Sequence, residues 1–162
     1  MSDNETRAAI GNVQGMGKLL SVLNSPNADP SIIKIAVSTI TECGRLAQNT
    51  KAINEEMGID KLVNLLRGTD VGGDEAVMIQ VNAAGALWSC LEVSEASRRT
   101  LRSAEGLNVI IQLLKRPTNF PLLINLSGLL WACALDPDVS NLALGPAYCF
   151  HTLCFVVRAT HA

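Results

Sequence analysis

Apolar residues recur at helical spacing in three segments that each begin with a glycine. The second segment shows the pattern most clearly, because Leu62, Leu65 and Leu66 fall on one helical face. A glycine at the first position can supply the positive φ that a tight turn needs. The sequence therefore predicts a turn and a medium-length helix at each site. The segments are residues 15–23, 58–66 and 106–114.

A longer helix is predicted after each of these segments, beyond a loop rich in glycine, proline and polar residues. Pro30 marks the first helix start, and Ser31 and Asp74 are the expected N-caps. The predicted long helices cover about residues 31–46, 74–91 and 120–135. A buried stripe is predicted at equivalent positions of the first two: Ala36, Ile40 and Cys43, then Ala83, Leu87 and Cys90.

A short segment before each glycine completes a repeating unit of short, medium and long helix. Residues 82–90 (NAAGALWSC) return 43 positions later as residues 125–133 (NLSGLLWAC). Self-similarity at a period of about 20–50 residues indicates stacked units that bury one continuous core. The short segments are residues 6–10, 49–53, 97–101 and 140–144. Residues 1–145 are thus predicted to be a repeat array, with units at about 1–14 (partial), 15–57, 58–105 and 106–145.

Residues 146–162 depart from this pattern, because Arg158 is their only Lys, Arg, Asp or Glu. One interpretation is a truncated fourth unit, since Phe150, Leu153 and Val157 match apolar positions of residues 107–114 at a step of 43. The other is a divergent apolar tail. The run is shorter than the roughly 20 residues of a transmembrane helix. A start inside a unit and a nearly uncharged end lead us to expect a fragment of a longer array.

Composition argues against several classes of function. The formal net charge is −2, whereas a nucleic-acid-binding face is strongly basic. Both histidines, His151 and His161, lie outside the predicted array, which leaves the repeats without an imidazole for acid–base chemistry. The sequence shows no phosphate-binding loop and no secretory signal. We therefore expect a non-secreted, cytoplasmic protein that is not an enzyme, uses no cofactor or small-molecule substrate, and does not insert into membranes. A nuclear or cytoskeleton-associated location is the alternative.

The cysteines and one arginine cluster favour structural explanations. Cys43, Cys90 and Cys133 share one repeat position on the buried stripe, where free cysteine behaves as a small apolar residue. Cys149, His151 and Cys154 lie close together without an evident fourth zinc ligand, and no metal site is predicted. Arg98, Arg99 and Arg102 form a local basic cluster. We interpret it as a solvated face, and the alternative is a site for an acidic partner.

These features resemble the armadillo repeat family. The resemblance rests on a three-helix unit of about 42 residues, on the GIxxLVxLL pattern of residues 58–66 and on AAGALW at residues 83–88, and it covers about residues 5–145. It implies an all-α fold: a right-handed armadillo-type superhelical solenoid of about three three-helix repeats. Third helices of the family line a concave groove that holds extended peptides or partner helices.

Within the family, the tryptophan positions resemble those of the catenins more than those of importin-α. In importin-α the groove pairs a tryptophan with an asparagine four residues later. The matching slots here are Ser38 and Glu42, Gly85 and Ser89, and Gly128 and Ala132. No such pair is present, and the tryptophans at 88 and 131 have the catenin-like placement instead.

The predicted function is a non-catalytic protein–protein interaction scaffold that binds a partner peptide or helix on the third helices. The tryptophans are either groove anchors or packing residues between successive third helices. The asparagines bond either to a bound peptide or to the preceding inter-helix loop. Alternatives are a cytoskeletal or ciliary assembly component that uses its outer surface, and a nuclear transport receptor. The expected contact set is Glu42, Asn82, Trp88, Ser89, Asn125 and Trp131.

Overall fold

The computed structural model describes residues 3–12, 14–25, 27–68, 73–115 and 119–136, and this part of the chain is all-helical. The predicted all-α class is confirmed. The predicted short segment at residues 140–144 and the predicted fourth unit or apolar tail at residues 146–162 lie outside the described residues. The helices are α1 (Asp3–Asn12), α2 (Gly15–Val22), α3 (Pro30–Cys43), α4 (Ala47–Glu55), α5 (Gly58–Arg67), α6 (Asp74–Val93), α7 (Glu95–Ser103), α8 (Gly106–Leu114) and α9 (Phe120–Ala134).

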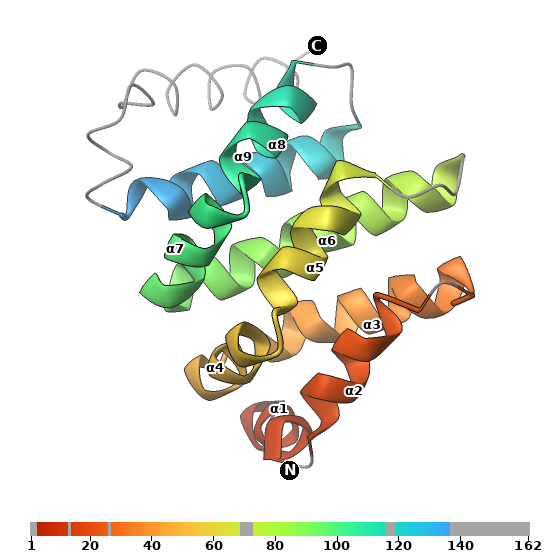
Figure 1. Cartoon of the computed structure of the whole chain (residues 1–162), viewed down its shortest axis with the longest axis vertical. Helices are drawn as coiled ribbons and strands as arrows, with labels where there is room; N and C mark the ends of the chain where they lie inside the picture. Colours follow the sequence, from red (N-terminus) through yellow and green to blue (C-terminus); the bar gives the residue numbers. More distant parts are fainter. Residues whose placement is uncertain (1–2, 13, 26, 69–72, 116–118, 137–162) are drawn as a thin grey trace.

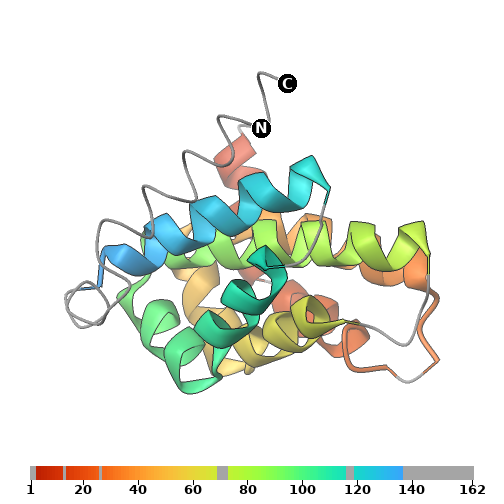
Figure 2. The same cartoon turned by 90° about the horizontal axis from the view of Figure 1, so that it is seen from above.

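The described helices form three successive groups of three, called units 1, 2 and 3: α1–α3, α4–α6 and α7–α9. Figure 1 shows them following one another along the longest axis of the molecule. The third helices lie side by side, with α6 packed against both α3 and α9. Figure 2 shows α6 and α9 on one side of the molecule and α5 and α8 on the other. The third helices therefore make up one continuous surface.

The turn before each second helix differs from the prediction. The residue before the glycine, not the glycine itself, has the positive φ: Gln14 at 54°, Met57 at 55° and Glu105 at 57°. Glycine is needed for close approach instead, because a Cβ at Gly58 would lie 2.6 Å from Cγ2 and 2.7 Å from the carbonyl oxygen of Ile53. The turn thus packs directly on the end of the preceding helix.

Two predicted N-caps are also wrong. Asp29 caps α3, and its carboxylate accepts a hydrogen bond from the backbone N–H of Ser31 at 2.8 Å. Pro30 occupies the first helical position, where its fixed φ suits the helix and its missing N–H costs nothing. Gly73 precedes α6, and Asp74 is the first residue of the helix, where its charge complements the helix dipole.

The predicted buried stripe is confirmed, and it joins the three units into one core. Ala36, Ile40 and Cys43 on α3 are buried, as are their equivalents on α6 and Cys133 on α9. Helix α6 lies at the centre of this core. Among the described helices it alone is long and apolar enough to cross a membrane by length and composition, but 50% of that stretch is buried, as in any central core helix.

Polar contacts between first helices fix how the units stack. Asn49 on α4 is 1% exposed, and its Nδ2 donates to the carbonyls of Arg7 at 2.8 Å and Cys43 at 3.0 Å. Asn54 on the same helix donates to the hydroxyl of Ser97 on α7 at 2.8 Å. Unit 2 is therefore bonded to both its neighbours.

Candidate partner-binding surface

The two asparagines of the expected contact set join successive third helices. Asn82 on α6 donates from Nδ2 to the carbonyl of Lys34 on α3 at 3.3 Å. Asn125 on α9 donates in the same way to the carbonyl of Val81 on α6 at 2.8 Å. The acceptor is thus the preceding third helix rather than a loop. Each Oδ1 has no hydrogen-bond partner among the described residues, so it can accept a hydrogen bond from a bound chain.

Trp88 packs between third helices. A Cβ built at Gly128 on α9 would lie 2.5 Å from Cδ2 and Cε2 of the Trp88 ring, so the ring lies directly against this glycine. The side chain is half-buried, and its Nε1 is buried without a hydrogen-bond partner in the described part of the chain. The main contact of Trp88 is therefore packing against α9, as one of the two interpretations expected, and part of the side chain remains accessible to solvent.

A hollow of about 170 Å³ on the third-helix side brings several expected residues together. Glu42 comes from α3, Asn82 and Trp88 from α6, and Asn125 from α9. Four of the six members of the contact set thus meet in one place, and each third helix contributes at least one. We call the hollow and its rim the third-helix surface. Its lining is completed by Ser38, Thr41, Arg45, Val81 and Gly85.

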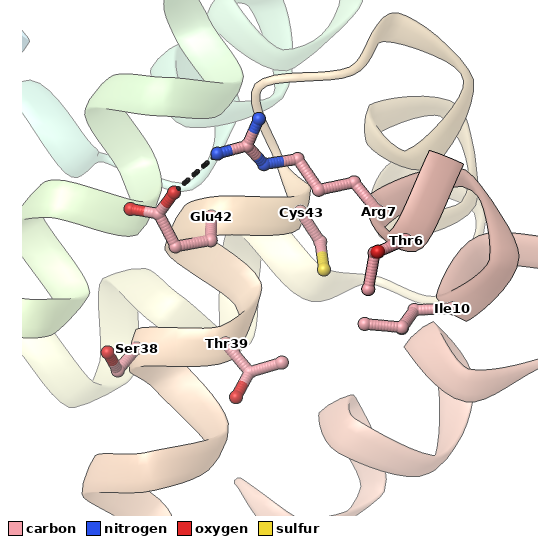
Figure 3. Close-up of a pocket in the computed structure, with 7 residues that line it drawn as sticks. All are labelled: Thr6, Arg7, Ile10, Ser38, Thr39, Glu42 and Cys43. Carbon is pink, nitrogen blue, oxygen red and sulfur yellow. Dashed lines mark hydrogen bonds and ion pairs between the residues drawn. The ribbon is translucent and has the colours of Figure 1, made fainter. Parts of the chain in front are cut away.

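Glu42 and Arg45 are the charged residues that line this surface, and Glu42 takes part in two ion pairs. Its carboxylate lies 2.9 Å from the guanidinium of Arg7 and 3.9 Å from Nε of Arg45. Figure 3 shows Arg7 reaching from α1 to Glu42 on α3. A second hollow of about 350 Å³ lies on the α1 side, and it shares Ser38 and Glu42 with the first. Because the ion pairs are solvent-exposed, they contribute little stability and leave the charges open to a ligand.

The other two members of the expected set lie elsewhere. Ser89 is 6% exposed, and its hydroxyl donates to the carbonyl of Ala86 at 2.9 Å, so it belongs to the core and not to the surface. Helix α6 is covered on both sides by α3 and α9, which buries the face that carries Ser89. Trp131 is 50% exposed on α9 and does not line the hollow.

The expected contact set left out five residues that line the hollow: Ser38, Thr41, Arg45, Val81 and Gly85. Ser38 and Gly85 occupy the same repeat position, and small side chains there leave room for the hollow. That recurrence was a usable signal. Arg45 follows the end of α3, where the sequence gives no sign that its side chain lies beside Glu42.

The cysteines of the buried stripe are not accessible nucleophiles. Burial raises the pKa of Cys90 to about 12, and the hydrogen bond with Ser89 offsets only part of this effect. Burial also raises the pKa of Cys43, although the Arg7 guanidinium opposes the change. Within the described ranges no three His, Cys, Asp or Glu side chains are grouped as metal ligands. The motif at residues 149–154 lies outside those ranges.

The predicted arginine cluster is divided among separate contacts. Arg98 donates to the carbonyl of Leu91, and Arg99 pairs with Glu95 one turn away. Arg102 lies 3.3 Å from the buried carboxylate of Asp136. Arg98 and Arg102 are half-buried and only Arg99 is exposed, so the predicted solvated face is found at Arg99 alone.

Comparisons with known proteins add no assignment: no family model matches the chain, and no curated protein matches it.

Proposed function

We propose that this chain is a non-catalytic protein–protein interaction scaffold that binds a partner peptide or helix on the third-helix surface. The proposal includes an armadillo-type, right-handed solenoid of three units, with the third helices on its concave side. The stacking of three three-helix units along one axis and the sequence resemblance support this arrangement.

The observation that carries the proposal is the convergence of four expected residues from three helices in one hollow. Each unit supplies at least one of them: Glu42 from α3, Asn82 and Trp88 from α6, and Asn125 from α9. They nevertheless line the same space of about 170 Å³. An accessible site that spans unit boundaries suits a segment that crosses several helices. Interface energy is typically concentrated in a few central aromatic and polar residues of this kind.

The chemistry of the lining indicates what kind of partner fits. The Oδ1 atoms of Asn82 and Asn125 offer hydrogen-bond acceptors to backbone N–H groups, and the accessible part of Trp88 offers apolar contact. Glu42 and Arg45 add one charge of each sign, so the surface does not select a strongly basic chain. We therefore propose a protein partner in the cytoplasm, with no nucleic acid, membrane or small-molecule substrate, consistent with the net charge of −2.

A peptide-display selection against the full chain tests this proposal. Selected peptides would be labelled, and their binding measured by fluorescence anisotropy with wild type and Ser38→Phe. Ser38 is exposed and lines the hollow without an internal hydrogen bond among the described residues, so a phenyl ring there fills the site without disturbing the core. We expect binding to weaken by about tenfold or more, which corresponds to about 1.4 kcal/mol.

Ser103→Phe is the matched control, because Ser103 is an exposed serine on α7 that does not line the hollow. It should bind the selected peptides as wild type does. Peptides that bind Ser38→Phe with undiminished affinity would place the site elsewhere. Weakening by Ser103→Phe alone would favour the outer surface of the molecule and an assembly role.

A further inference from the structure

Helix α9 carries an exposed apolar stripe that no other described helix covers. Its members recur at steps of four, seven and four residues, which places them on one helical face. Each is at least 40% exposed: Phe120 at 42%, Ile124 at 40%, Trp131 at 50% and Leu135, just after the helix end, at 46%. A contiguous stripe of large apolar side chains marks an interaction surface more reliably than scattered ones do.

The equivalent face of α6 shows what such a stripe contacts. Val77, Val81 and Trp88 lie 43 residues before Phe120, Ile124 and Trp131. On α6 these positions are buried or half-buried, because α9 packs over them. The α9 stripe is therefore the equivalent face one unit later, with no incoming helix among the described residues.

Two contacts define the incoming helix at the existing interface. At the α6–α9 interface the incoming helix is α9. Its Asn125 donates to the backbone carbonyl of Val81, and its Gly128, three residues later, lies against the ring of Trp88. The α3–α6 interface has the same layout: Asn82 donates to the carbonyl of Lys34, and Gly85 lies against Thr41. On α9 the corresponding features are the carbonyl of Ile124 and the ring of Trp131.

We propose that the α9 stripe docks a partner protein's helix that carries asparagine and, three residues later, glycine. The asparagine donates to the carbonyl of Ile124, and the glycine lies under Trp131. This end-face site is distinct from the third-helix surface and does not depend on the function proposed for it.

Residues 1–162 do not offer an unengaged matching helix. Residues 137–162 contain no asparagine followed three residues later by glycine. A second copy would present α3, where Ile35 and Ser38 stand at the asparagine and glycine positions. Ile35 has no donor, and a Cβ at the glycine position falls 2.5 Å from the ring at the existing interface. Asn82 and Asn125 of a second copy are already engaged.

A peptide made from α9 itself is the direct probe, because α9 is the natural occupant of the equivalent face on α6. The probe is a stapled, fluorescein-labelled peptide of residues 120–134 with F120K, I124E and W131K. These changes make its own stripe polar and leave Asn125 and Gly128 in place. Binding to the full chain would be measured by fluorescence anisotropy.

Three comparisons decide the result. A G128A peptide and, separately, a Trp131→Ala protein should each bind about tenfold more weakly or worse. An N125A peptide should also lose affinity. Met57→Gln is the protein control, because Met57 is an exposed apolar residue (63%) in the turn before α5 and not on α9. Glutamine is compatible with this turn, since Gln14 has nearly the same φ in the turn before α2. The control protein should bind the probe as wild type does.

Several outcomes would overturn the proposal. These are no binding of the probe, equal binding of the G128A peptide, or an unchanged affinity in Trp131→Ala. Equal loss in Met57→Gln would indicate general apolar adhesion and would also overturn it. Because Trp131 is half exposed, its removal should leave the helical circular dichroism spectrum intact.

Discussion

A single methyl group at Gly128 is expected to destabilise the protein, whereas the same group at Gly85 is not. Both glycines occupy the same repeat position in the middle of a third helix. A Cβ at Gly128 would lie 2.5 Å from two ring carbons of Trp88. A Cβ at Gly85 would meet Asn125 Nδ2 at 3.3 Å and Thr41 Cγ2 at 3.7 Å, which small shifts accommodate.

The difference between the two substitutions isolates the contact with Trp88. Replacing a mid-helix glycine with alanine gains about 1 kcal/mol of helix propensity at either site. Overpacking typically costs about 1–3 kcal/mol, and only Gly128→Ala incurs it in full. Gly128→Ala should therefore be less stable than Gly85→Ala by about 1–3 kcal/mol.

Urea denaturation followed by circular dichroism measures this difference, and a double-mutant cycle attributes it. In a Trp88→Ala background the ring is gone, so Gly128→Ala should no longer be destabilising relative to Gly85→Ala. The coupling energy between positions 88 and 128 should be about 1–3 kcal/mol. Equal stabilities of Gly128→Ala and Gly85→Ala in the wild-type background, or a difference that persists without Trp88, would refute this description of the interface.

Three further predictions test the fold. Asn49→Ala should cost about 1–3 kcal/mol in the free energy of unfolding, because two hydrogen bonds from Nδ2 are lost, although the Cys43 carbonyl keeps its bond from the Leu46 N–H; a loss below about 0.5 kcal/mol would contradict the contact. Gly58→Ala should lower the melting temperature, because its Cβ meets backbone of the preceding helix; an unchanged melting temperature would argue against that close approach. Cys90 ionises more readily when unfolded, so between pH 9 and 12 stability should fall with pH more steeply in wild type than in Cys90→Ala, by up to about 1.4 kcal/mol per pH unit; parallel pH profiles would contradict the raised pKa.

The sequence predicts the helices and the core stripe well, because both follow from local periodicity. Ala83, Leu87 and Cys90 recur at spacings of four and three residues, and all three are buried. The recurrence of residues 82–90 as 125–133 also locates the interface between third helices. The pattern does not show whether a recurring residue packs against a neighbouring helix or contacts a ligand, because both roles produce the same recurrence. The structure assigns Trp88 mainly to packing by placing Gly128 against its ring.

Other features depend on distances that a sequence does not contain. Glycine at 58 serves either a positive φ or a close approach, and only the position of Ile53 shows that it is the second. Ser89 is expected on the surface because it matches a groove slot of the armadillo family, yet α6 is covered on two sides and the residue is buried. For the asparagines, the sequence leaves a bound peptide and the preceding inter-helix loop as alternatives, but the acceptor is the carbonyl of a helix one unit earlier.

The bonding of Asn49 has a consequence for how the protein folds. The donor lies in unit 2, while both acceptor carbonyls belong to unit 1, and Asn54 extends the linkage to Ser97 in unit 3. The buried side-chain amide of Asn49 therefore finds its acceptors only across the boundary with unit 1. In stacked repeats, strong terms between neighbours make the units fold together rather than one by one. Thermal unfolding of the three units is accordingly expected as a single cooperative transition, with unit 2 as the centre from which order spreads to both ends.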